Sequence, residues 1–120
     1  MWYNAYMRDI NAYRTAWRRK HPDRYKAIGR NHRLKKAYGI SSTDYWRMYA
    51  WQRGRCYICG EPEKRRKDKT GVIRRLSIDH DHETGKVRGL LCANCNNMLG
   101  LALDNPVLLE KGAAYIRQFK

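Results

Sequence analysis

Aromatic and aliphatic residues recur at intervals of three and four positions along the first part of the chain. This spacing places them on one face of an amphipathic helix, with arginines and a lysine crowding the turns that follow. The helix is expected to stop at His21-Pro22, because proline disrupts a helix interior but is well suited to start one. The residues of the apolar face are Tyr3, Tyr6, Met7, Ile10, Tyr13 and Trp17.

Two more helices are predicted before residue 55. The first runs from Pro22 to Tyr38 and ends at Gly39, since glycine commonly terminates a helix. The second opens at Ser41, where Asp44 three residues later resembles a capping box, and continues through Tyr49. The first 55 residues are therefore predicted to be helical.

The pattern changes after Arg55. Residues 72–78 and 87–91 alternate enough to predict two strands joined by a turn. A helix is expected from about residue 93 to Gly100, and Asn105-Pro106 opens a last helix. The sequence thus predicts an α+β fold that is mostly helical and has one small sheet.

Charge divides the chain in the same place. The 120 residues carry a formal net charge of +15, and residues 1–55 hold 14 Lys or Arg against 3 Asp or Glu. We therefore expect a basic helical arm over residues 1–53 and a globular domain over residues 54–120. A charge this high indicates a polyanionic partner, most often nucleic acid. With no apolar run of membrane-spanning length and no signal pattern at the N-terminus, we expect a cytoplasmic protein.

The basic residues of the arm are candidate phosphate contacts. Such contacts give salt-sensitive affinity with little sequence information. The alternative is an ordinary solvated helix face, which the scarcity of acidic partners disfavours. The candidates in the arm are Arg18, Arg19, Lys20, Arg30, Arg33, Lys35 and Lys36, and a second patch is formed by Lys64, Arg65, Arg66 and Lys67.

Four cysteines form two Cys-x-x-Cys pairs, Cys56 with Cys59 and Cys92 with Cys95. Two such pairs are typical of a tetrahedral structural zinc site. Two disulfides are the alternative, but a reducing compartment disfavours them. We predict one structural zinc, whose binding free energy would contribute to folding a domain with little apolar material.

Four ionisable residues in a row, Asp79-His80-Asp81-His82, lie between the cysteine pairs. In isolation they could form a solvated turn. Because zinc would bring this segment close to the second cysteine pair, however, Asp79 and His80 are expected to approach Asn96. The carboxylate oxygens of Asp79 and the amide oxygen of Asn96 suit magnesium or manganese, and the neutral imidazole of His80 can take a proton from water.

These motifs, taken together, resemble a known family. Residues 76–82 (Leu-Ser-Ile-Asp-His-Asp-His) and 84–92 (Thr-Gly-Lys-Val-Arg-Gly-Leu-Leu-Cys) are similar to the phage recombination endonuclease VII family. So are the first cysteine pair and the dipeptides Cys95-Asn96 and Leu99-Gly100. That family belongs to the HNH, or His-Me finger, nucleases, and the resemblance covers roughly residues 54–119. It implies a ββα-metal fold stabilised by zinc, and it places a phage-encoded protein in the host cytoplasm.

The resemblance also implies roles for single residues. Asp79 and Asn96 would hold one catalytic magnesium or manganese ion, and His80 would be the general base. His82 would contact the phosphate or assist the leaving group. The implied reaction is hydrolysis of DNA phosphodiester bonds to 5′-phosphate and 3′-hydroxyl ends. Apart from the resemblance, Arg88 lies on the second predicted strand and is a candidate phosphate contact, with a plain surface arginine as the alternative.

The chain departs from the family pattern at two positions. Ser77 and Leu99 stand where the archetype of the family has a histidine and an acidic residue, so the third ligand of the catalytic metal is open. Branched DNA, a specific duplex site and non-specific duplex remain open as substrates, as do nicking and a homodimer. The competing interpretations are a zinc-stabilised nucleic-acid-binding protein without catalysis and a phage accessory factor.

Overall fold

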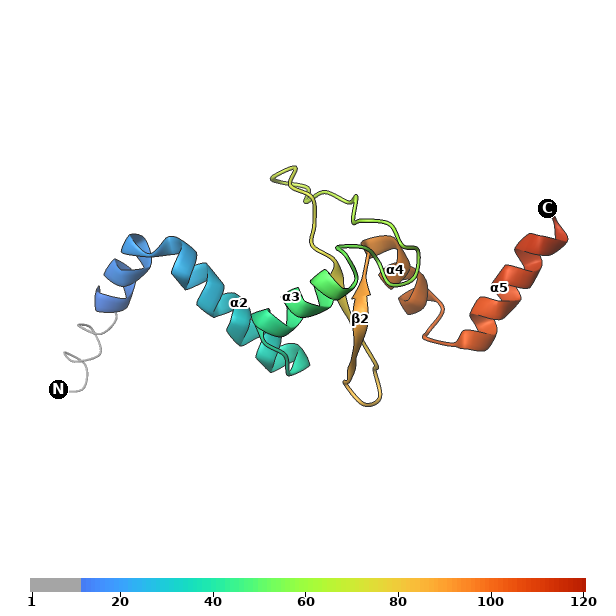
Figure 1. Ribbon diagram of the computed structural model, residues 1–120, viewed down its shortest axis with the longest axis horizontal. Helices are drawn as coiled ribbons and strands as arrows, with labels where there is room; N and C mark the ends of the chain where they lie inside the picture. The colour runs from blue at the N-terminus through green and yellow to red at the C-terminus, as the bar shows by residue number, and fades with distance from the viewer. Residues whose placement is uncertain (1–11) are drawn as a thin grey trace. The chain divides into compact units, whose positions relative to one another are not determined.

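The computed structural model describes residues 12–120 (Figure 1). The chain divides into two compact units between residues 43 and 44. Of the apolar face predicted for the first helix, Tyr3, Tyr6, Met7 and Ile10 lie outside the described residues. Within the described part, none of the helices combines the length and the hydropathy needed to cross a membrane.

The first unit is helical, as predicted. Residues 12–20 form a helix that is interrupted at His21, and α2 spans Pro22–Tyr38. Pro22 occupies the first turn of α2, and Gly39 ends it with φ +70°, donating its N–H to the carbonyl of Lys35 at 2.9 Å. The left-handed conformation explains the glycine, because a Cβ atom is unfavourable there. Both predicted ends of α2 are confirmed.

Helix α3, Ser42–Trp51, crosses the division between the units, and most of it belongs to the second. Tyr45 is 2% exposed and donates its hydroxyl to the carbonyl of Leu76 at 2.8 Å. Gln52, just after the helix, bonds to Leu90. These bonds tie α3 to the second unit, which is why that unit begins before the cysteines, at residue 44. The boundary at 53/54 between a basic arm and a nuclease domain stays a prediction.

The sheet of the second unit has two antiparallel strands, β1 (Ser77–His80) and β2 (Val87–Leu91). The second strand matches its prediction. The first begins five residues later than predicted, because residues 64–75 fold back on themselves, with one isolated bridge between Arg66 and Ile73. Leu76, Leu90 and Leu91 are buried here.

The strand register has one irregularity that matters for the site. Asp79 pairs with Gly89 and His80 pairs with Val87, so Arg88 is an extra residue on β2. An extra residue of this kind is a β-bulge, and a bulge re-aims a side chain and increases local twist.

Two helices follow the sheet. Helix α4 spans Ala93–Leu101 and lies beside β2 (Figure 1), whereas α5 spans Pro106–Gln118 and has no buried residue. The side chain of Asn105 caps α5 by accepting the N–H groups of Val107 and Leu108 at 3.0 and 3.4 Å. The prediction of a mostly helical α+β fold with one small sheet is confirmed.

Candidate functional site

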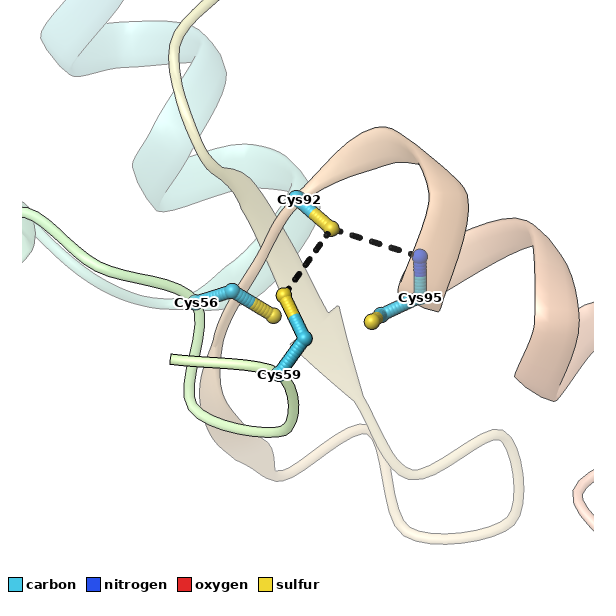
Figure 2. A group of neighbouring side chains, drawn as sticks. All are labelled: Cys56, Cys59, Cys92 and Cys95. Atoms are coloured by element: carbon cyan, nitrogen blue, oxygen red, sulfur yellow. Dashed lines mark hydrogen bonds between the residues drawn. The ribbon is translucent and has the colours of Figure 1, made fainter. Parts of the chain in front are cut away.

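The four cysteine sulfurs converge from two segments of the second unit. Cys56 and Cys59 come from the loop after α3, and Cys92 and Cys95 from the start of α4, with their sulfurs pointing toward one another (Figure 2). All four ligand atoms lie within 4.8 Å of one another, and each thiol is free. The sulfurs of Cys59 and Cys92 are 3.8 Å apart. Four ligands at 2.3 Å around a tetrahedral ion would be separated by about 3.8 Å, so the spacing fits zinc.

Backbone geometry prepares part of this cluster for a metal. Burial raises the pKa of the Cys56 thiol, but the backbone N–H groups around it, foremost that of Cys59, outweigh burial and lower the pKa to about 7. Burial raises the pKa values of Cys92 and Cys95 above the ordinary thiol value. A cation would have to displace the protons of these two thiols, since the thiolate is the ligand.

Cys92 also starts helix α4. Its sulfur accepts the backbone N–H of Cys95 at 3.4 Å, which satisfies one of the free donors at the helix N-terminus. The cluster thereby fixes the first turn of α4, which carries Asn96, a half-buried residue, directly after Cys95.

Asp79 is the buried carboxylate of the site, at 9% exposure in the middle of β1. Arg88 binds both of its oxygens, with Nε 2.7 Å from Oδ2 and Nη2 2.9 Å from Oδ1. The hydrogen bond to Asp79 raises the pKa of Arg88 further above its ordinary value, so the guanidinium stays charged. Asp79 is therefore bound at both oxygens by a residue on the opposite strand.

A second carboxylate, Asp104, joins this pair. Its oxygens lie 3.3 Å from Nη2 of Arg88 and 3.6 Å from Nε2 of His82. Asp104 has φ +53° and follows Leu103 at φ +56°, so two consecutive left-handed residues turn it back toward the sheet. An open cleft of about 620 Å³ lies here. It is lined by residues from the turn after β1, from β2, from the end of α4 and from the turn after α4: Asp81, His82, Glu83, Arg88, Gly100, Leu103 and Asp104.

The structure brings the two candidate histidines together. His80 ends β1, and its ring centroid is 4.8 Å from that of His82 in the turn that follows. Asp81, which lies between them in the sequence, stabilises the turn: its Oδ1 accepts the N–H groups of Glu83 and Thr84 at 2.8 and 3.0 Å. These backbone N–H groups, Thr84 foremost, lower the pKa of Asp81. The approach of Asn96 to Asp79 and His80 stays a prediction.

Sequence reasoning missed Asp104. No motif marks it, because it reaches the site through the turn after α4 and not through a fixed spacing from the other residues. Arg88 was singled out, but as a phosphate contact, whereas its guanidinium here holds two carboxylates. The signal for that role would have been the pairing of its strand with β1.

The basic candidates of the first unit lie on helical surface. In helix 12–20 and in α2 their side chains are exposed, except for half-buried Arg30. The guanidinium of Arg18 lies over the ring of Tyr25, 4.7 Å from its centroid. The exposed residues are Arg18, Arg19, Lys20, Arg33, Lys35 and Lys36 in the first unit, and Lys64, Arg65, Arg66 and Lys67 in the second.

The second unit has the architecture of the ββα-metal class, a β-hairpin followed by a helix. Here a four-cysteine cluster holds the first turn of that helix. The family can be stated more narrowly. The model of the recombination endonuclease VII family matches residues 31–118, and the chain belongs to that family.

Two phage proteins are similar to this chain. It is 46% identical over 87 residues to the Gene 59 protein of Mycobacterium phage D29 and 44% identical over 85 residues to the Gene 59 protein of Mycobacterium phage L5. These matches cover 72% and 70% of this chain and 48% of each relative, so the chain spans about half the length of the relatives it matches.

A solved structure is also similar, the ββα-Me type II restriction endonuclease Hpy99I. It is 31% identical to this chain with a TM-score of 0.44, and the match covers 74% of this chain and 48% of that protein.

Proposed function

We propose that this chain is a metal-dependent endonuclease that hydrolyses phosphodiester bonds in DNA. The observation that carries the proposal is membership of the recombination endonuclease VII family combined with the placement of three residues in one ββα unit. Asp79 and His80 lie at the end of β1, and Asn96 lies in the first turn of α4. Residues of these types serve as oxygen ligands and as a proton acceptor.

One zinc ion, bound by the four cysteines, would have a structural role. Four sulfur ligands close a tetrahedral shell and leave no position for water or substrate. The cluster would therefore act on catalysis indirectly, by fixing the helix turn that carries Asn96.

Asp79 and Asn96 would hold one catalytic magnesium or manganese ion. Their carboxylate and amide oxygens are ligands that such hard cations prefer. When bound, the cation would neutralise charge on the scissile phosphate and the departing oxygen. Asp79 can accept the hydrogen bonds of Arg88 and bind a cation at the same time, since each carboxylate oxygen has two lone pairs.

His80 would take the proton of the attacking water, and His82 would contact the phosphate or assist the leaving 3′ oxygen. An imidazole is suited to the first task because its ordinary pKa lies near neutrality. The products would carry 5′-phosphate and 3′-hydroxyl ends. The reaction class corresponds to an HNH-type enzyme.

The basic helices would supply most of the affinity for DNA through phosphate contacts. In this proposal residues 1–53 act as the binding arm and residues 54–120 as the nuclease domain. A contact from Arg88 to phosphate would be made beside Asp79. Branched DNA, a specific duplex site and non-specific duplex are alternative substrates in this proposal, and nicking by a single site and paired cuts by a homodimer are alternative outcomes. The place of action would be the host cytoplasm.

The test is incubation of the zinc-loaded chain with supercoiled plasmid, with and without magnesium. Nicking should require magnesium and disappear in His80→Ala and Asn96→Ala, while both variants still bind DNA. Asn97→Ala, at the exposed neighbour of Asn96 in α4, is the matched control and should cut normally. Nicks that DNA ligase reseals directly would support the proposed ends, and equal cutting by all variants would indicate a contaminating nuclease.

A second function, DNA binding without catalysis, is favoured by one observation. Both oxygens of Asp79 are engaged by Arg88, as in a purely structural ion pair. If the plasmid is bound but never cut with magnesium or manganese, this second function replaces the first, whether the chain acts alone or as an accessory factor.

A further inference from the structure

The segment between the first cysteine pair and β1 is a small hairpin that carries a concentrated positive charge. We define it as the basic hairpin, residues 64–75. It contains seven Lys or Arg and one Asp, a net charge of +6. Every residue in it is exposed, and Figure 1 shows it as a loop extending away from the sheet.

Backbone hydrogen bonds close the basic hairpin. The N–H of Arg74 donates to the carbonyl of Arg65 at 2.8 Å, and the N–H of Lys67 donates to the carbonyl of Val72 at 2.8 Å. At the tip, Nη1 of Arg66 donates to the carbonyl of Gly71 at 2.7 Å. The charges are therefore displayed on a paired ribbon and not on an unstructured linker.

Glu63 anchors the base of the basic hairpin to helix α4. Its Oε1 accepts the N–H groups of Lys64 and Arg65 at 3.0 and 2.9 Å, and its Oε2 accepts the N–H of Ala93 at 2.6 Å. Nη2 of Arg65 also donates to Oδ1 of Asn94 at 3.3 Å. The basic hairpin is thereby fastened to the helix that Cys92 caps and that carries Cys95 and Asn96.

We propose that the basic hairpin is a second nucleic-acid-binding element that grips the phosphate backbone of duplex DNA beside the ββα unit. This inference rests on the proposed function, because it assumes a DNA substrate. A two-stranded ribbon is one of the shapes that fits along a DNA groove, and lysine and arginine side chains bind its phosphates. An acidic protein is the less suitable partner, since two exposed apolar residues, Val72 and Ile73, do not make the core of a protein interface.

The test removes three charges from the hairpin without touching its internal bonds. The variant is Lys67→Gln, Lys69→Gln and Arg74→Gln in the full zinc-loaded chain. The matched control is Lys111→Gln, Arg117→Gln and Lys120→Gln, which removes the same charge from the exposed C-terminal segment. Binding of a fluorescein-labelled duplex of arbitrary sequence is measured by anisotropy at several salt concentrations, without added magnesium.

The hairpin variant should bind on the order of tenfold more weakly, and the slope of log Kd against log salt should fall by about 2–3, roughly one for each phosphate that the variant no longer neutralises. The control should change the slope by less than about one. Equal effects of both variants would overturn the inference, because the effect would then come from net charge. Unchanged duplex binding by the hairpin variant would also overturn it and would leave an acidic protein as the partner.

This experiment is independent of catalysis. If the native chain never cuts plasmid but the hairpin variant loses duplex affinity, the proposed nuclease activity fails and the hairpin inference stands. Equal melting temperatures of native and variant chains would show that the loss comes from the removed side chains and not from unfolding.

Discussion

Arg88 on β2 and Asp79 on β1 form a two-point ion pair between the strands, with N–O distances of 2.7 and 2.9 Å. The carboxylate is nearly buried, whereas the guanidinium is 38% exposed. Because of this difference in exposure, substitutions of the two residues have different effects on stability. Arg88 can be replaced without leaving a cavity, but Asp79 cannot easily lose its partner, because a buried charge without compensation is unfavourable.

We therefore expect Arg88→Ala to lower the free energy of unfolding by about 1–3 kcal/mol. Arg88→Lys should lose less, since an ammonium keeps the charge but not the two-point geometry. Urea denaturation of the zinc-loaded chain measures both. The double variant Arg88→Ala with Asp79→Asn should be more stable than Arg88→Ala alone. A single variant within about 0.5 kcal/mol of the native chain would contradict the argument.

Tyr45 joins α3 to the start of the sheet. Tyr45→Phe removes the bond to the carbonyl of Leu76 and should cost about 1 kcal/mol. Burial, with a smaller contribution from Tyr49, raises the pKa of Tyr45 from 10.0 to about 12. Above pH 10 the unfolded chain loses this proton first, so the free energy of unfolding should fall by up to about 2–3 kcal/mol as pH rises toward 12.

The control for this pH dependence is Tyr45→Phe itself. Denaturation at about pH 9 and about pH 11 should show a smaller loss in the variant than in the native chain, because the variant has no phenol at this position. A near-ultraviolet titration should also show one tyrosine fewer ionising late. Identical pH dependence of the two chains would contradict the assignment.

Local signals predicted the helices well. Pro22 and Gly39 fixed both ends of α2, and Asn105-Pro106 fixed the start of α5, because capping depends on residues that are close in sequence. The cysteine spacing likewise predicted the sulfur cluster, since two residues between cysteines fit one metal ion.

The sequence alone did not predict how distant segments pair. Alternation placed the first strand at residues 72–78, but those residues pair partly within the basic hairpin and β1 begins at Ser77. The bulge at Arg88 arises from strand register, which no single strand reveals. Asp104 depends on two left-handed residues with no glycine to mark them.

Cys92 caps α4 and is also one of the proposed ligands of the structural zinc ion. Cys92→Ala removes both the metal ligand and the cap of α4, whereas Cys92→Ser keeps an N-capping oxygen. Zinc binding to such sites is worth about 10 kcal/mol or more, compared with about 1 kcal/mol for a cap. Both variants should therefore lose the cooperative melt of residues 44–120.

Calorimetry and metal analysis measure this outcome. A chelator should abolish the same transition in the native chain, and added zinc should restore it there but not in either variant. A cooperative melt retained in Cys92→Ala, or a stable Cys92→Ser chain without metal, would show that the cysteines do not hold a structural ion.

The side chain of Gln52 forms hydrogen bonds with backbone groups at the outer edge of β2. Its Oε1 accepts the N–H of Leu90 at 3.0 Å, and its Nε2 donates to the carbonyls of Leu90 and Arg55 at 2.9 and 2.8 Å. Leu90 is fully buried, and Tyr57 also donates to its carbonyl at 3.0 Å. The carboxamide thus acts as a short third strand, and the N–H of Leu90 is the group that depends on it most.

Gln52→Ala should consequently cost about 1–3 kcal/mol, because it leaves a buried donor without its acceptor. The amide of Leu90 should also exchange with solvent faster, while Gln118→Ala at the exposed end of α5 should change neither quantity. Gln52→Glu keeps the acceptor but turns a donor into a negative oxygen facing two carbonyls. The folded state should therefore raise the pKa of that new carboxyl, so the variant should regain stability as pH falls and the carboxyl becomes a donor. Native-like exchange of the Leu90 amide in Gln52→Ala would refute this account, because the donor would then have another acceptor.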